Sequence, residues 1–124
     1  MFKRILVAAI LMAIPTSIYA QGRNFVDEPG YEYETIAASQ TDQVLGTTGA
    51  VGDYLHRLVC DVNTAATSAV AIEDGTETAI NMLENNVGSG VGVYVIDLGI
   101  LSRDGGWEVT TGAGVTCIGV GRFS

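Results

Sequence analysis

The sequence predicts an all-β fold: a small antiparallel β-sandwich of the jelly-roll type, with about six to seven short strands preceded by an extended N-terminal arm. After residue 44, apolar runs rich in valine, isoleucine and threonine follow one another closely. Glycine occurs 16 times in the 124 residues and interrupts these runs too often for stable helices. Short, closely spaced strands of this kind are typical of sandwiches and small barrels.

Residues 1–20 have the layout of a secretory signal peptide. Lys3 and Arg4 precede an apolar run over residues 5–14, which is followed by Pro15 and a small-residue end at Ala20. The run is about half the roughly 20 residues that a transmembrane helix needs. We therefore expect an exported chain whose mature part, from residue 21, has no membrane association. An uncleaved anchor, or a hydrophobic arm buried in an assembly, is the alternative.

Residues 21–43 predict an acidic, extended arm with at most one short strand, over residues 33–38. The segment is polar and aperiodic around Pro29 and Gly30, and Tyr31 and Tyr33 lie between its acidic residues. Tyrosines are common anchors at protein interfaces, so both are candidate partner contacts. The alternative is a solvated lead-in without a partner.

Residues 44–124 form the predicted sandwich domain. Two turn signals separate its strands: Asp74-Gly75, which predicts a tight type I′ hairpin, and Asp104-Gly105-Gly106, which predicts another reversal. The predicted strands cover residues 53–62, 68–73, 76–83, 92–98, 107–111 and 114–123.

The run from Val91 to Ile96 is apolar at nearly every position. Such a strand is buried on both faces, either in the middle of a sandwich or at a subunit interface. This pattern favours an oligomer over a lone monomer.

The charge of the chain excludes some classes of partner. All 14 acids follow residue 20, whereas Lys3 and Arg4 precede it, so residues 21–124 carry four cations and 14 acids, a net charge of −10. A surface this negative repels phosphate backbones and anionic lipid heads. We therefore expect no nucleic-acid and no membrane-surface partner.

Cys60 and Cys117 are the two cysteines of the chain. In an exported protein a disulfide between them is chemically allowed. The alternative is a pair of buried free thiols that pack as small hydrophobic side chains.

No constellation of residues predicts catalysis, a cofactor or a metal site. His56 is the single histidine, and strict alternation would put Tyr54, His56, Leu58 and Cys60 on one face of a strand, with nothing to orient the imidazole. One histidine and two cysteines do not complete a tetrahedral zinc site. Trp107 is either a candidate contact for a partner or sugar or, as we favour, a core residue.

Residues 43–58 (QVLGTTGAVGDYLHRL) resemble a stretch of small uncharacterised proteins of tailed bacteriophages. The resemblance extends over about residues 38–123, including the acidic Asp74-Gly75 turn and the last hairpin around Trp107. It implies a compact β-domain that belongs to, or decorates, a virus particle, and it carries over no active-site residues. The leader and the two cysteines depart from that pattern and fit export.

The predicted function is therefore that of a non-enzymatic structural subunit, virion-associated or at a cell surface, which self-associates or decorates a larger particle. The alternative is an exported, monomeric β-sandwich module that binds a carbohydrate or a cell-surface ligand near Trp107.

Overall fold

The computed structural model describes residues 30–85 and 90–124. The chain divides into a segment that ends at Gly30 and a compact unit over Tyr31–Ser124, and the description below concerns the second unit. The signal peptide predicted over residues 1–20 lies outside the described residues and stays a prediction. Within the described part, no helix has the length and apolar character needed to cross a membrane.

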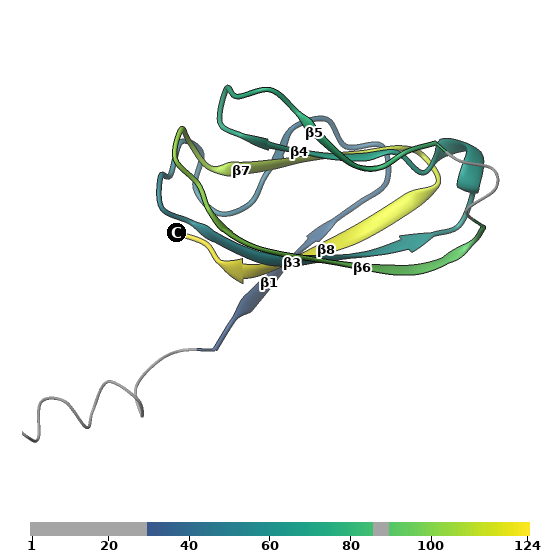
Figure 1. Ribbon diagram of the computed structural model, residues 1–124, viewed down its shortest axis with the longest axis horizontal. Helices are drawn as coiled ribbons and strands as arrows, with labels where there is room; N and C mark the ends of the chain where they lie inside the picture. Colours follow the sequence, from purple (N-terminus) through teal and green to yellow (C-terminus); the bar gives the residue numbers. More distant parts are fainter. Residues whose placement is uncertain (1–29, 86–89) are drawn as a thin grey trace, which may run out of the picture. The chain divides into compact units, whose positions relative to one another are not determined.

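The unit is a two-layer antiparallel sandwich, which confirms the predicted all-β class (Figure 1). We call the sheet with strand order β1-β8-β3-β6 sheet A and the sheet with order β2-β7-β4-β5 sheet B. The strands are β1 (Glu32–Ile36), β2 (Gln43–Val44), β3 (Tyr54–Val62), β4 (Val70–Asp74), β5 (Ile80–Leu83), β6 (Gly92–Leu101), β7 (Trp107–Thr111) and β8 (Val115–Arg122), with a single 3-10 turn, Ala65–Thr67, between β3 and β4.

The core lies between the two sheets and is built from alternate side chains of the central strands. Leu58 and Val62 of β3 are at most 2% exposed, as are Ile72 of β4 and Val109 of β7. Trp107 is 4% exposed, and its indole N–H donates to the carbonyl of Asp53 over 3.0 Å. The favoured interpretation of Trp107 as a core residue agrees with this position.

The alternation predicted for β3 is wrong at one end. The pairing of β3 with both neighbours shifts between Leu55 and Arg57. Against β8 the extra residue of the β-bulge is His56 of β3, whereas against β6 two residues of β6, Leu98 and Gly99, lie opposite His56. The bulge reverses the side-chain phase: Leu55, Leu58 and Cys60 are buried, whereas Tyr54 and His56 are half-buried on the outer surface. His56 and Cys60 therefore do not share a face.

The tight hairpin predicted at Asp74-Gly75 is also wrong. A type I′ turn needs positive φ at both central residues, but only Gly75 has it, at 58°. The last pair between β4 and β5 is Ile72 with Ile80, so seven residues, 73–79, lie between the last two paired positions. The carboxylate of Asp74 explains the opening, because it accepts bonds from the backbone N–H groups of residues 103–105.

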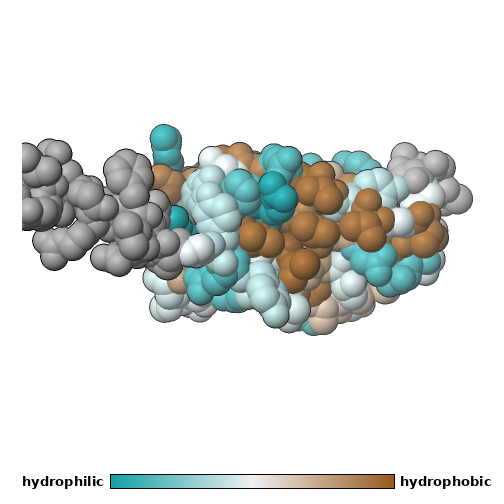
Figure 2. All heavy atoms as spheres, turned by 90° about the horizontal axis from the view of Figure 1, so that it is seen from below, coloured by the Kyte–Doolittle hydropathy of each residue, from teal (hydrophilic) through white to brown (hydrophobic). Residues whose placement is uncertain are grey.

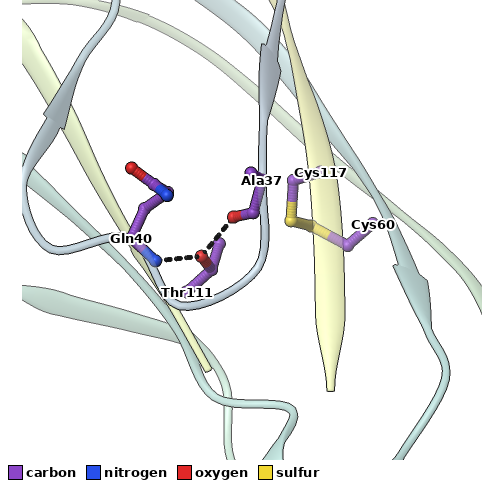
Figure 3. Close-up of a disulfide and its surroundings, with 5 residues drawn as sticks. All are labelled: Ala37, Gln40, Cys60, Thr111 and Cys117. Carbon is purple, nitrogen blue, oxygen red and sulfur yellow. Dashed lines mark hydrogen bonds between the residues drawn. A yellow bond between two sulfur atoms is a disulfide. The ribbon is translucent and has the colours of Figure 1, made fainter. Parts of the chain in front are cut away.

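A disulfide joins Cys60 of β3 to Cys117 of β8, with 4.1 Å between their Cα atoms (Figure 3). The two residues are directly opposite in the β3–β8 register. Close by, the hydroxyl of Thr111 accepts from the backbone N–H of Gln40 and donates to the carbonyl of Ala37 (Figure 3). These bonds fix the connection between β1 and β2 against β7.

The short strand predicted within the N-terminal arm is present as β1, which pairs along its whole length with β8. The predicted strands at 53–62, 107–111 and 114–123 match β3, β7 and β8 closely. The strand predicted over 92–98 extends further, to Leu101.

Candidate functional site

The outer face of sheet A is apolar, although it faces away from the core. A row of directly opposed residues crosses all four strands from Thr35 through Ile118 and Val59 to Val95. Val95 is 57% exposed, and Ile118 and Val59 are half-buried with no second layer over them in the described part of the chain. Figure 2 shows this face, with brown apolar side chains gathered near its centre.

The next positions along the strands continue the apolar surface. Val93 of β6 is 65% exposed, and Val120 of β8 lies opposite Tyr33 of β1. A shallow hollow of about 470 Å³, lined mainly by apolar atoms, lies between Thr35, Val59, Val93 and Ile118. We call the surface formed by Val59, Val93, Val95, Ile118 and Val120 the apolar face.

The outer face of sheet B is different in character. There, Glu73 of β4 is paired with Glu108 of β7, and oxygen atoms of Asp42, Glu73 and Glu108 lie within 4.8 Å of one another. Burial raises the pKa of the Glu108 carboxyl, and the charges of Asp42 and Glu73 raise it further. Three carboxylates could hold a cation, but exposed acidic groups commonly gather without one, so we assign no metal site.

An aromatic cluster borders the apolar face at the end of sheet A where β1 begins. The Tyr31 ring is stacked on the His56 imidazole, with centroids 4.4 Å apart, and the guanidinium of Arg122 lies 5.6 Å from the Tyr31 centroid. The Tyr54 hydroxyl lies 3.3 Å from Nδ1 of His56. The β3 bulge makes this cluster, because it turns Tyr54 and His56 outward.

Burial raises the pKa of the Tyr54 phenol above its usual value, as do the charge of Tyr31 and a hydrogen bond with it, while Arg122 lowers it. The phenol therefore remains protonated at neutral pH. Beside it, Arg57 and Asp97 form an ion pair over 3.1 Å. A second shallow hollow, of about 370 Å³, lies between Tyr54, His56 and this pair.

The structure places the predicted contact residues apart. Tyr31 and Tyr33 are 49% and 69% exposed on sheet A, whereas Trp107 lies in the core. Sequence reasoning missed Ile118 and Val59 as surface residues and did not connect Tyr31 with His56. For Ile118 the sequence did contain a signal: β8 alternates glycine or cysteine with apolar residues, so both of its faces are apolar.

No family model matches the chain, and no curated protein matches it. Among solved structures, it matches the TDP-fucose-3,4-ketoisomerase WlaRA of Campylobacter jejuni at 10% identity and a TM-score of 0.30, over 75% of this chain and 61% of that one. It matches a Tobacco streak virus coat protein dimer at 12% identity and a TM-score of 0.32, over 79% and 89%. The capsular polysaccharide assembling protein CapF of Staphylococcus aureus matches at 13% identity and 0.29, over 77% and 26%.

The chain thus spans less than two thirds of the ketoisomerase and about a quarter of CapF. These weak neighbours include a virus coat protein, and no family or curated match confirms a phage decoration protein. The prediction that the chain is not an enzyme is contradicted, because the matches include ketoisomerases. We correct it: the fold does not exclude catalysis. At these TM-scores the matches carry no argument for any activity of this chain.

Proposed function

We propose that the chain is a structural subunit of an exported or virion-associated assembly, and that it docks through the apolar face of sheet A. The single observation that carries the proposal is the uncovered row Ile118–Val59–Val95. In an antiparallel sandwich the outer faces are ordinarily polar. A contiguous apolar surface that lies outside the core is typical of a protein interaction site.

The outer faces of the two sheets differ in charge, and this difference supports docking through sheet A only. The cluster of Asp42, Glu73 and Glu108 keeps the outer surface of sheet B hydrated and charged. On sheet A, the charge of Asp97 is balanced by Arg57, and the one further carboxylate that the described residues place beside the apolar face is that of the exposed Asp61, opposite Val93. An acidic protein that presents one mainly apolar face can remain soluble alone and still bind a partner over that face.

Export is part of the proposal. It rests on the leader predicted over residues 1–20, and it is supported by the Cys60–Cys117 disulfide, because disulfides persist in oxidising compartments. The tyrosines of the N-terminal arm extend the docking surface, since Tyr33 lies beside Val120 at its margin.

The test compares Ile118→Lys with Val51→Lys, each expressed with its own leader in the source of the protein. Ile118 lies in the middle of the apolar face, while Val51 is 62% exposed in a turn outside sheet A. We expect wild type and Val51→Lys to sediment with a particle or envelope fraction in a density gradient, and Ile118→Lys to stay with free protein. Equal sedimentation of both variants would contradict the proposal.

A second candidate is an exported module that binds a carbohydrate, and the observation in its favour is the hollow beside Tyr54, His56 and the Arg57–Asp97 pair. Aromatic rings can pack against the apolar face of a sugar ring, and a carboxylate and a guanidinium at their edge can form hydrogen bonds with its hydroxyl groups. A glycan array tests it: binding that Asp97→Asn abolishes would support this candidate, and an array without signal would remove it.

A further inference from the structure

The sandwich has four edge strands, and three of them are protected against pairing with another chain. Strand β1 has five residues, two of them acidic, while β2 has two residues and β5 has four. Short length and charge are the usual means by which a monomer blocks its sheet edges. Strand β6, with ten residues, is the longest in the described fold. Its one charged residue is Asp97, and a bulge at Leu98 and Gly99 interrupts its pairing with β3, so residues 92–97 form its regular part.

Strand β6 is long and mostly apolar. Its single charged residue is Asp97, which is paired with Arg57 of β3. The sequence of β6 contains no proline and no lysine. Within the described residues, β3 is its single strand neighbour, so one side of its backbone has no strand partner.

The register identifies which backbone groups point to that side. The Cα atoms of Cys60 and Cys117 are 4.1 Å apart, the distance of a non-hydrogen-bonded pair in an antiparallel ladder. Hydrogen-bonded and non-hydrogen-bonded pairs alternate along the ladder, so the pair three positions further along should be hydrogen-bonded. The bond from the N–H of Asn63 to the carbonyl of Gly114 confirms this. The N–H and C=O of Cys60 therefore point to β6, where Tyr94 is opposite. By alternation, the N–H and C=O groups of Val93 and Val95 point to the open side.

Among the described residues, the space between the sheets is also open along β6. Leu98 and Ile100 face the core side but are only half-buried, as is Met82 of β5 in sheet B. A hollow of about 240 Å³ lies between Met82, Leu83 and Tyr94, so the two edge strands border the same side of the sandwich. We call this surface, formed by β5 and β6, the open side.

We infer that the open side binds a second copy of this chain, with β6 pairing antiparallel to β6 so that two A sheets become one continuous sheet. This inference rests on the proposed assembly function and names one of its partners. An antiparallel edge is self-complementary about a twofold axis. A twofold axis that passes near Val95 or Ile96 keeps the Asp97 side chains of the two copies apart. An axis at Asp97 would place these two carboxylates opposite each other, and like charges opposite each other are destabilising.

Charge favours a second copy over another protein. Two acidic chains can meet over residues 92–96 of β6, which carry no charge, whereas a basic partner would be attracted to the acidic surface of sheet B and to Glu84, which lines the hollow of the open side. A ten-residue strand is about 34 Å long and the sheets of a sandwich are about 10 Å apart. The open side therefore offers on the order of 340 Å² per copy, well below the roughly 800 Å² of a standard interface, so backbone hydrogen bonds rather than buried area would hold the two copies together.

The test compares Val95→Pro with Val95→Thr by sedimentation equilibrium of the purified, disulfide-bonded protein. Proline removes an N–H that points to the open side and leaves the bonds to β3 intact, whereas threonine keeps the N–H and the β-branched shape. We expect a dimer for wild type and Val95→Thr, and a dissociation constant at least about tenfold higher for Val95→Pro. Circular dichroism should show the same fold in all three.

Amide hydrogen exchange distinguishes edge pairing from other contacts. In the dimer the amides of Val93 and Val95 should exchange slowly, and in Val95→Pro the amide of Val93 should exchange fast. A wild-type monomer, a dimeric Val95→Pro, or a dimer with fast exchange at both valines would overturn the inference. None of these results bears on Ile118→Lys, whose sedimentation tests the proposed function separately.

Discussion

At the scale of single residues, Asp74 and Asp104 connect two loops by reciprocal hydrogen bonds. Asp74 accepts from backbone N–H groups at 103–105. Asp104 in turn accepts from both the N–H and the hydroxyl of Thr76, each over 2.7 Å. The loop after β4 and the loop after β6 are therefore held together by two carboxylates and by the hydrogen bond from the N–H of Gly75 to the carbonyl of Gly106.

We predict that Asp104→Asn lowers the melting temperature at pH 7 by a few degrees. The bonds from Thr76 lower the pKa of Asp104 below its ordinary 3.8, so the folded chain binds fewer protons there than the unfolded chain. The stabilisation is complete above pH 3.8 and is lost as the pH falls through the lowered pKa. The melting temperatures of Asp104→Asn and wild type should therefore converge as the pH is lowered from 7 into the acid range. Asp61→Asn, an exposed control on sheet A, should have the melting temperature of wild type at every pH.

Glu108 has the opposite linkage. Burial and the neighbouring carboxylates raise its pKa above the ordinary 4.5, so its ionised form destabilises the fold as the pH rises through that raised value. We predict that Glu108→Gln stabilises the protein at pH 7 by roughly 0.5 kcal/mol or less, because the group is solvent-screened. The difference should vanish below pH 4.5. Chemical denaturation checks it, and a less stable variant at pH 7 would contradict it.

At the scale of elements, apolar runs and turn residues predict most strands of the fold, because a strand needs only local alternation and a break at each end. The sequence does not predict the bulge in β3, because His56 and Arg57 contain no signal for an inserted residue. It also leaves undecided whether β6 is central or an edge strand, since that depends on strand order. The aromatic cluster of Tyr31, Tyr54 and His56 depends on the bulge, so the sequence does not predict it either.

The β3–β8 connection gives a prediction at this scale. The disulfide closes a segment with a sequence separation of 57, for which the chain-entropy model gives about 4 kcal/mol. The double variant Cys60→Ala, Cys117→Ala should therefore melt roughly 20 °C below the oxidised wild type. A reductant should lower the melting temperature of wild type toward that of the variant and leave the melting temperature of the variant unchanged. Melting within a few degrees of wild type would show that the bond contributes little.

At the scale of the whole molecule, the distribution of charge separates two tendencies of the same chain. The net charge of −8 keeps copies apart in solution. The apolar face lies on sheet A and the open side lies along β5 and β6, and both favour contact, whereas the acidic cluster lies on the outer face of sheet B. Association is therefore directed to particular surfaces as long as the remaining surface repels.

This balance should fail near the isoelectric point, which lies at about 4.3. As the pH falls toward that value the carboxylates become neutral and the repulsion that opposes contact between apolar faces disappears. We predict that solubility falls several-fold there, and that Ile118→Lys resists the fall more than Val51→Lys. Both variants add one positive charge, but only the first interrupts the apolar face.

The solubility of wild type, Ile118→Lys and Val51→Lys, measured as a function of pH, distinguishes loss of charge repulsion from contact between apolar faces. If charge alone governed it, the variants would precipitate alike at a slightly higher pH than wild type, because each raises the isoelectric point equally. A greater solubility of Ile118→Lys at its own isoelectric point can come only from the surface it changes. Full dispersion of wild type at pH 4.3 would show that the apolar face is not what brings these molecules together.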